Sequence, residues 1–158
     1  MRSAIFDFRD INALWTKRLY LEYASVCYQF NLENELHPAT ISVEPIKSYG
    51  QWRTATRNIV IADHLIRDYP WDTVVEVLKH EMAHQLVVES WKYCYASNTP
   101  HGPAFMDACR RLGVPDWAAA ASGELPTQIE RSEGRRLSDE EERLLRRAEK
   151  LLSLAGSE

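Results

Sequence analysis

The chain has 158 residues, 45% of them hydrophobic and 27% charged, with a formal net charge of −4. This length suffices for one domain with a buried core, and the acidic balance argues against a broad nucleic-acid-binding surface. Because no apolar run approaches the ~20 residues needed to cross a bilayer, we expect no transmembrane segment.

The first part of the chain is predicted to form one long helix and then a small sheet. Apolar residues recur near helical spacing between residues 7 and 30, at Ile11, Leu14, Trp15, Leu19 and Val26. A strand is expected over residues 40–47, where Pro45 restricts it to an edge or an end of the sheet. Residues 51–56 and 58–62 are expected to form a hairpin, so the predicted sheet is antiparallel.

A second helix is expected over residues 71–90, a stretch without Gly or Pro. Asp72 is an acceptable N-cap for it. Leu78, Met82 and Leu86 share one side of this helix, and further apolar residues lie on the opposite side. A helix that is apolar on both sides is typical of a buried, central position.

Residues 80–84 of this helix spell H-E-M-A-H. Residues four apart lie on one face of a helix, so His80 and His84 can point at one metal ion, with Glu81 beside them. There Glu81 could take a proton from a metal-activated water. The alternative is that two core histidines bond to backbone carbonyls while Glu81 pairs with a basic residue.

A catalytic zinc ion usually takes three protein ligands and leaves a fourth position to water. Glu89 lies nine residues after His80, about 180° around the helix, and is expected to face away. His101 is the better candidate because it stands at the start of another predicted helix, with Pro103 in its first turn and Gly113 at its end.

The remaining histidines are weaker candidates for the metal. His37 precedes Pro38 in a predicted turn. His64 follows the predicted strand at 58–62 and is expected at the surface. The sequence therefore favours His80, His84 and His101 as the ligand set.

H-E-M-A-H at 80–84 followed by H-G-P-x-F at 101–105 resembles the SprT-like family of zinc metallopeptidases. Residues 50–53 and 57–62 resemble the short hairpin that precedes the active-site helix in that family. The resemblance implies an α+β, zincin-like fold, with a small antiparallel sheet packed on the central helix. It also implies that His80, His84 and His101 bind Zn²⁺ and that Glu81 is the general base of peptide hydrolysis.

The chain also departs from a common pattern of that family, the four-cysteine zinc ribbon. Its cysteines contain no C-x-x-C pair, so we expect no second zinc site; they are Cys27, Cys94 and Cys109. Unpaired cysteines without a signal peptide indicate a cytoplasmic protein.

The expected partner is a protein or peptide substrate, since the family includes proteases that degrade proteins crosslinked to DNA. DNA-associated or unfolded proteins are therefore candidate substrates, although the net charge does not support DNA binding. Two local groups of basic residues are interpreted as ordinary solvated charges; they are Arg53, Arg57 and Arg67, and Arg110 with Arg111.

The expected domain covers residues 1–123, a polar linker covers 124–137, and an amphipathic helix covers 138–158. Ser138 and Glu141 form a capping box at the start of that helix. The helix is expected to dock on the domain or on another chain, or to open a second domain of a longer protein. Trp117 and the alanines near it are expected to pack on the core.

Two further expectations concern catalysis. Tyr93, Tyr95 and Arg53 are candidates for stabilising an oxyanion, and a substrate strand could add to the edge of the sheet. The alternative function is a zinc-binding interaction or regulatory module without turnover. A purely structural zinc site would not need Glu81, which favours the peptidase.

Overall fold

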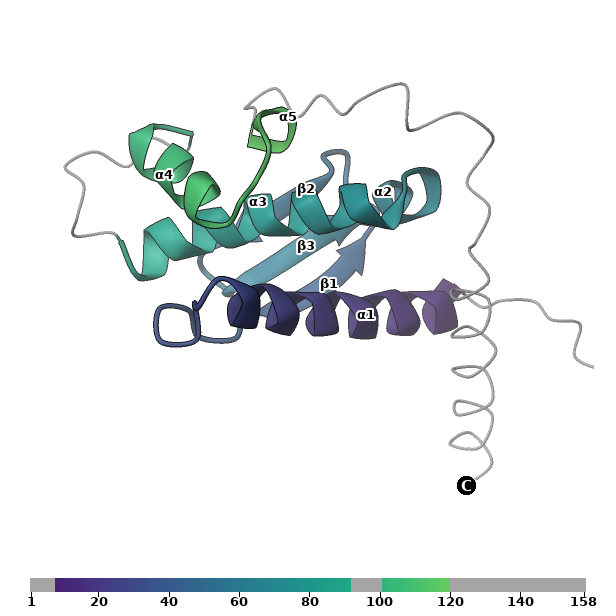
Figure 1. Cartoon of the computed structure of the whole chain (residues 1–158). Coiled ribbons are helices and arrows are strands. Elements are labelled where there is room, and N and C mark those ends of the chain that lie inside the picture. The colour runs from purple at the N-terminus through teal and green to yellow at the C-terminus, as the bar shows by residue number, and fades with distance from the viewer. Residues whose placement is uncertain (1–7, 92–100, 120–158) are drawn as a thin grey trace, which may run out of the picture.

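The computed structural model describes residues 8–91 and 101–119. Figure 1 labels its elements, which are α1 (Phe8–Gln29), β1 (Thr40–Glu44), β2 (Gly50–Arg53), β3 (Asn58–Ala62), α2 (Asp63–Asp68), α3 (Trp71–Glu89), α4 (Pro103–Arg111) and α5 (Asp116–Ala119). The predicted domain end at 123, the linker and the C-terminal helix lie outside the described residues.

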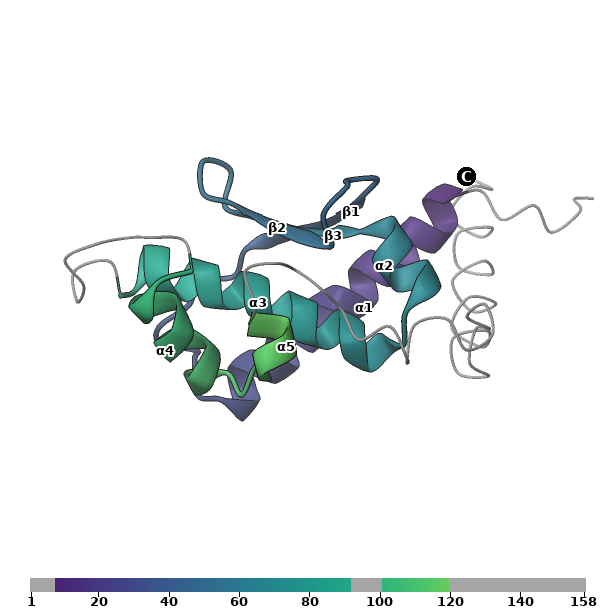
Figure 2. The same ribbon diagram turned by 90° about the horizontal axis from the view of Figure 1, so that it is seen from above.

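The elements form three layers with α3 in the middle. The sheet lies on one side of α1 and α3, while α4 and α5 pack on the other side of α3 (Figure 2). Because α3 is covered from both sides, Leu78, Met82 and Leu86 are fully buried. The predicted α+β class and the central position of this helix are confirmed.

The sheet has the strand order β1-β3-β2 and is mixed. The hairpin of β2 and β3 is antiparallel as predicted, but β1 pairs with β3 in parallel, so the prediction of a wholly antiparallel sheet was wrong. The physical reason is that side chains alternate with a period of two in either orientation. The alternation around Ile41 and Val43 therefore indicates the buried face without indicating strand direction.

One face of the sheet is apolar and packs on the helices, while the other carries polar side chains. The pairs Ile41↔Ile59 and Gly50↔Ile61 lie on the helix side. Arg53, paired with Asn58, lies on the other face, because residues opposite each other in a ladder share a side. Pro45 directly follows β1, an edge strand as predicted.

The ends of α1 and α3 have local causes. Asn31 adopts a left-handed φ of 55° after α1, and the Leu32 N–H donates to the Cys27 carbonyl at 2.8 Å, which closes the helix. At α3 the N-cap is Pro70 and no side chain caps the helix, so the assignment of Asp72 as N-cap was wrong by two residues. Among the described residues, no helix is long and apolar enough to cross a membrane.

Candidate metal centre

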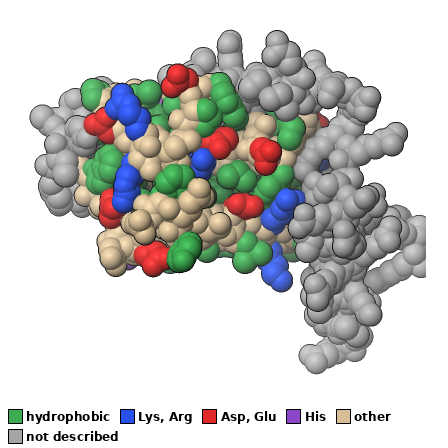
Figure 3. All heavy atoms as spheres, in the orientation of Figure 1, with side chains coloured by type: hydrophobic (Ala, Val, Ile, Leu, Met, Phe, Trp, Pro, Cys, Tyr) green, Lys and Arg blue, Asp and Glu red, His purple; other side chains and the backbone are tan. Residues whose placement is uncertain are grey.

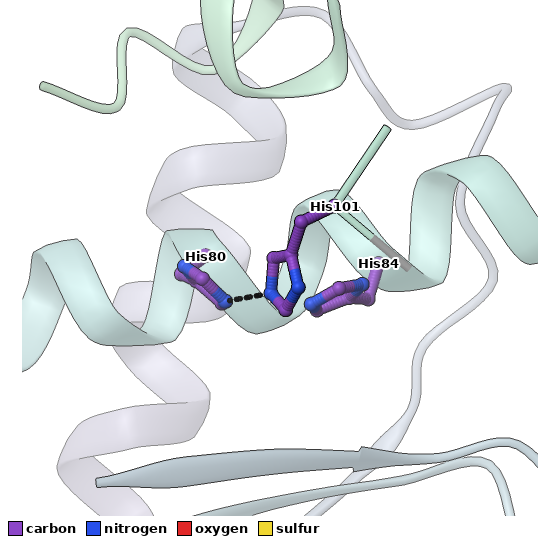
Figure 4. A group of neighbouring side chains, drawn as sticks. All are labelled: His80, His84 and His101. Atoms are coloured by element: carbon purple, nitrogen blue, oxygen red, sulfur yellow. Dashed lines mark hydrogen bonds between the residues drawn. The ribbon is translucent and has the colours of Figure 1, made fainter. Parts of the chain in front are cut away.

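Three histidine side chains from two segments converge on one point. His80 and His84 project from neighbouring turns of α3, and His101 comes from the segment that leads into α4 (Figure 4). Among the described residues they form the one group of three or more potential metal ligands, and their ligand atoms all lie within 4.8 Å of one another. The tertiary structure thus brings together the three histidines that the sequence singled out.

His101 stands just before α4, and both ends of this helix are set by local sequence. Gly102 is the N-cap and Pro103 occupies the first turn, where its missing N–H costs nothing. At the other end Gly113 has a φ of 65°, and the Val114 N–H donates to the Cys109 carbonyl at 2.9 Å. Helix α4 packs on α3, and His101, which directly precedes the N-cap of α4, lies next to the H-E-M-A-H segment.

The spacing of two of the imidazoles fits ligands of one tetrahedral metal ion. The Nε2 atoms of His80 and His101 are 3.4 Å apart. Metal–nitrogen bonds of about 2.0–2.1 Å at tetrahedral angles place two ligand nitrogens about 3.3–3.4 Å apart. The donor set therefore fits a first-row cation that prefers imidazole ligands.

Phe105 supports all three imidazoles. Its ring lies 4.3 Å, centroid to centroid, from His84 in a stacked arrangement, and 4.8 Å from both His80 and His101. Only 1% of Phe105 is exposed, so the ring is itself held by the core. The sequence indicated Phe105 as the last residue of the H-G-P-x-F motif, but its contact with each imidazole depends on how α4 packs on α3.

Burial keeps the histidines in the neutral form that binds metals. Burial, reinforced by the charges of His80 and His101, lowers the pKa of His84 to about 3. Burial also lowers the pKa of His80 and that of His101. Near neutral pH the site therefore presents imidazole lone pairs, as metal coordination requires.

Glu81 lies next to the histidines and is buried without a full set of partners. Glu81 is 5% exposed, and its Oε2 atom has no hydrogen-bond partner. Its Oε1 atom lies 3.8 Å from the Nε2 atom of His80. Burial raises the pKa of Glu81 to about 8, and a cation held by the histidines would offset this desolvation. A buried carboxyl group with one unbonded oxygen beside three imidazoles is suited to act as a general base once a cation lowers its pKa.

Glycine at position 50 allows β2 to lie close to Glu81. A Cβ atom on Gly50 would lie 3.1 Å from the Val77 Cγ1 atom, 3.2 Å from the Glu81 Cγ atom and 3.3 Å from the Val60 carbonyl oxygen. These distances are shorter than ordinary carbon contacts. The absence of a side chain at Gly50 therefore allows the close approach of the edge strand β2 to α3.

The last described helix contacts the site through its backbone. The Nδ1 atom of His80 lies 2.5 Å from the carbonyl oxygen of Ala118 in α5. Ala118 and Ala119 are buried and Trp117 packs against the core, which confirms the predicted packing of this segment. Every residue has a backbone carbonyl, so this contact could not be predicted from the residue types in the sequence.

The weaker ligand candidates lie elsewhere. Glu89 accepts two hydrogen bonds of 2.9 Å from Arg57, which confirms that it faces away from the metal site. The His37 side chain is exposed. His64 is half-buried, with its Nε2 atom 3.1 Å from the Ile46 carbonyl oxygen, so its expected surface position was wrong in part.

The candidates for an oxyanion donor divide into two groups. Arg53 lies on the sheet face opposite α3 and pairs with Glu44 at 3.2 Å, so its assignment to the oxyanion was wrong. Tyr93 and Tyr95 lie outside the described residues. The sequence placed Arg53 near the motif, but the twofold alternation of β2 directs its side chain away.

The two groups of basic residues do not form a bare positive patch. Each arginine pairs with an acidic side chain, as in Arg53–Glu44, Arg57–Glu89, Arg67–Asp63, Arg110–Asp107 and Arg111–Glu35. On the face drawn in Figure 3, Lys and Arg side chains are interspersed with Asp and Glu. This agrees with the interpretation of these arginines as ordinary surface charges.

Comparison with known proteins gives one match. The sequence model described as the SprT-like family matches residues 6–130. No curated protein and no solved structure matches the chain. The matched range includes all three histidines and Glu81.

Proposed function

The chain belongs to the SprT-like family, and from this premise we propose that it is a zinc-dependent metallopeptidase that hydrolyses peptide bonds. The observation that carries the proposal is the convergence of His80, His84 and His101 beside the buried carboxylate of Glu81. A structural zinc site is normally closed by four protein ligands. Three histidines with an adjacent carboxylate favour a site that keeps a position for reaction.

In this proposal His80, His84 and His101 hold Zn²⁺, and each residue has a distinct role. When bound, zinc would supply Lewis-acid chemistry that acidifies water and polarises a carbonyl group. Glu81 would accept a proton from the attacking water and later deliver it to the leaving amine. Phe105 would keep the imidazole rings in a fixed arrangement, since it contacts all three.

The substrate would bind as an extended strand along β2. This strand is an edge of the sheet, and Gly50 brings it next to Glu81. Main-chain hydrogen bonds to an edge strand recognise any extended peptide, so the proposal includes loose side-chain specificity. Unfolded or DNA-associated proteins are the proposed substrates, and a reducing cytoplasm is the proposed location.

The test compares the wild-type chain with a Glu81→Gln variant. We expect both to bind about one zinc ion per chain, because Glu81 is not a ligand. Cleavage of an unfolded protein by the variant should fall by about 100-fold or more, the usual contribution of a general base. Zinc content is measured by metal analysis and cleavage by gel electrophoresis, with and without single-stranded DNA and with a DNA-crosslinked protein.

Glu89→Gln is the matched control, since it makes the same chemical change on the same helix, on the side away from the histidines. This control should retain cleavage. Equal cleavage by Glu81→Gln and the wild type would remove Glu81 from the mechanism. Purified wild-type protein that binds no zinc would refute the proposed function as a whole.

A further inference from the structure

The short helix α5 contacts the first proposed ligand directly through a backbone atom. The carbonyl oxygen of Ala118 lies 2.5 Å from the Nδ1 atom of His80. The opposite ring nitrogen, Nε2, faces His101 at 3.4 Å and the Glu81 carboxylate at 3.8 Å. One ring atom is thus bonded to α5 while the other is directed into the site.

A carbonyl can only accept a hydrogen bond, so this contact requires a proton on Nδ1 of His80. A neutral imidazole carries one proton, which leaves the lone pair on Nε2. That is the tautomer in which Nε2 can bind a metal. From this geometry we infer that α5 is a positioning element of the metal centre, which fixes the tautomer and the ring orientation of His80 before the metal binds.

The packing of α5 explains how such a short helix can hold a ligand. The N–H groups of Ala118 and Ala119 both donate to the Pro115 carbonyl at 3.0 Å, which closes the turn. The side chains of Ala118 and Ala119 are 6% and 4% exposed, so they are fixed in the core. The last carbonyls of a helix have no partner within it, and the one at Ala118 is therefore free to accept from His80.

The small size of Ala118 matters for the same reason. A larger side chain at this buried position has to push α5 outward, and this movement would withdraw the carbonyl from His80. Hydrogen bonds to the outer nitrogen of a ligand histidine typically contribute about 10- to 100-fold to metal affinity. The metal affinity of the whole site thus depends on a backbone atom 38 residues further along the chain.

The first arm of the test needs no variant. In the metal-free full-length chain labelled with ¹⁵N-histidine, a long-range ¹H–¹⁵N spectrum distinguishes the two tautomers. We expect His80, assigned by its loss in His80→Gln, to carry its proton on Nδ1. A His80 ring protonated mainly on Nε2, or exchanging between both tautomers, would overturn the inference whatever the enzymatic activity.

The second arm compares Ala118→Leu with Asp116→Leu, which places the same side chain on the exposed side of the same turn. We expect zinc affinity, measured by competition with a chromophoric chelator, to fall about 10- to 100-fold for Ala118→Leu. Affinity for Asp116→Leu should be unchanged. Wild-type affinity in a folded Ala118→Leu variant would contradict the inference, and circular dichroism verifies the fold.

This inference rests on the proposed metal site, but the two fail in different ways. A wild-type chain that binds no zinc would refute the proposed function, and the tautomer of His80 would still be measurable. A zinc-binding, proteolytic chain with the other tautomer in its metal-free form would refute only the role of α5.

Discussion

Gly50 in β2 faces Glu81 in α3 so closely that a Cβ atom on the glycine would lie 3.2 Å from the Glu81 Cγ atom. Within the same distance range the added atom would also meet the Val60 carbonyl oxygen, which belongs to the backbone of the paired strand β3 and cannot rotate away. Glu81, the proposed general base, and the edge strand β2 therefore share one tightly packed contact.

This contact predicts the effect of Gly50→Ala. The added methyl group should displace Glu81 or β2 and lower the free energy of unfolding by about 1–3 kcal/mol, as overpacking does. Peptidase activity per folded molecule should fall while zinc content stays unchanged, because no ligand is touched. Activity and metal content are measured on the same samples after denaturant unfolding has given the folded fraction.

Gly113→Ala is the matched control for that experiment. It also replaces a glycine by alanine, but its cost comes from the φ of 65°, which alanine rarely adopts, and its added Cβ atom would meet the Phe30 ring instead of Glu81. It should lower stability without lowering activity per folded molecule. Equal loss of activity in both variants would mean that stability alone, rather than the Gly50–Glu81 contact, limits catalysis.

The proposed ligand set predicts which histidine substitutions abolish zinc binding and which leave it unchanged. His101→Ala should abolish stoichiometric zinc binding, and because His101 is exposed, the apo fold should survive. His37→Ala replaces an exposed histidine outside the cluster and should leave the zinc content unchanged. Retention of tight zinc binding by His101→Ala would show that a different third ligand is used.

Metal removal should lower the stability of the wild-type chain. A ligand that binds only the folded state stabilises it by about 4 kcal/mol when its free concentration is about 1,000 times the Kd. We therefore expect a chelator to lower the melting temperature of the wild type and to have no effect on His101→Ala. A chelator-induced shift of equal size in both proteins would contradict a site built on His101.

Gln85, next to His84, belongs to a buried hydrogen-bond network whose loss should lower the free energy of unfolding. It is fully buried; its Nε2 atom donates to the His37 carbonyl at 2.9 Å, and its Oε1 atom accepts from the Tyr23 hydroxyl at 2.9 Å. Gln85→Leu should cost about 0.5–1.5 kcal/mol for each hydrogen bond removed, because the Tyr23 hydroxyl still donates to the His37 carbonyl at 3.3 Å. Denaturant unfolding of Gln85→Leu, Tyr23→Phe and the double variant should give a coupling of about 0.5–3 kcal/mol. Strict additivity of the two single variants would refute the coupling.

Two buried thiols should make the free energy of unfolding decrease at alkaline pH. Burial raises the pKa of Cys27 to about 11 and that of Cys109 to about 12, from 9.0 in the unfolded chain. Between these values the unfolded chain releases protons that the folded chain retains, so stability should fall as the pH rises above 9. The slope is at most about 1.4 kcal/mol per pH unit for each thiol.

Cys27→Ala and Cys109→Ala should each flatten the dependence of unfolding free energy on pH between 9 and 11. Both variants are also expected to lose some stability at pH 7, because the buried sulfur atoms leave space behind. The difference in slope, rather than the absolute stability, is the quantity that tests the prediction. A slope unchanged in both variants would assign the alkaline loss to other groups.

Much of this architecture could be predicted because the signals are local. The four-residue spacing of His80 and His84, the start of α4 at Pro103 and its end at Gly113 each depend on backbone geometry within one or two turns. The same local geometry correctly excluded Glu89, since its angle around α3 is fixed by its distance from His80 along the chain.

The predictions that were wrong concern how segments distant in the chain pack on one another. The direction of β1 could not be predicted, because alternating burial is the same for parallel and antiparallel strands. Arg53 was a candidate because it precedes the motif in the chain, but the pairing of β2 with β3 turns its side chain to the opposite face.

The sequence by itself determined the chemistry of this protein: which three imidazoles and which carboxylate are available, and that two of the imidazoles share a helix face. Only the tertiary structure decided how they are held. Gly50 allows the close approach of strand and helix, Phe105 lies against all three imidazoles, and the Ala118 carbonyl bonds to His80. The physical reason is that these contacts use a missing side chain, an apolar ring and a backbone oxygen, whose roles depend on position in space and not on residue type.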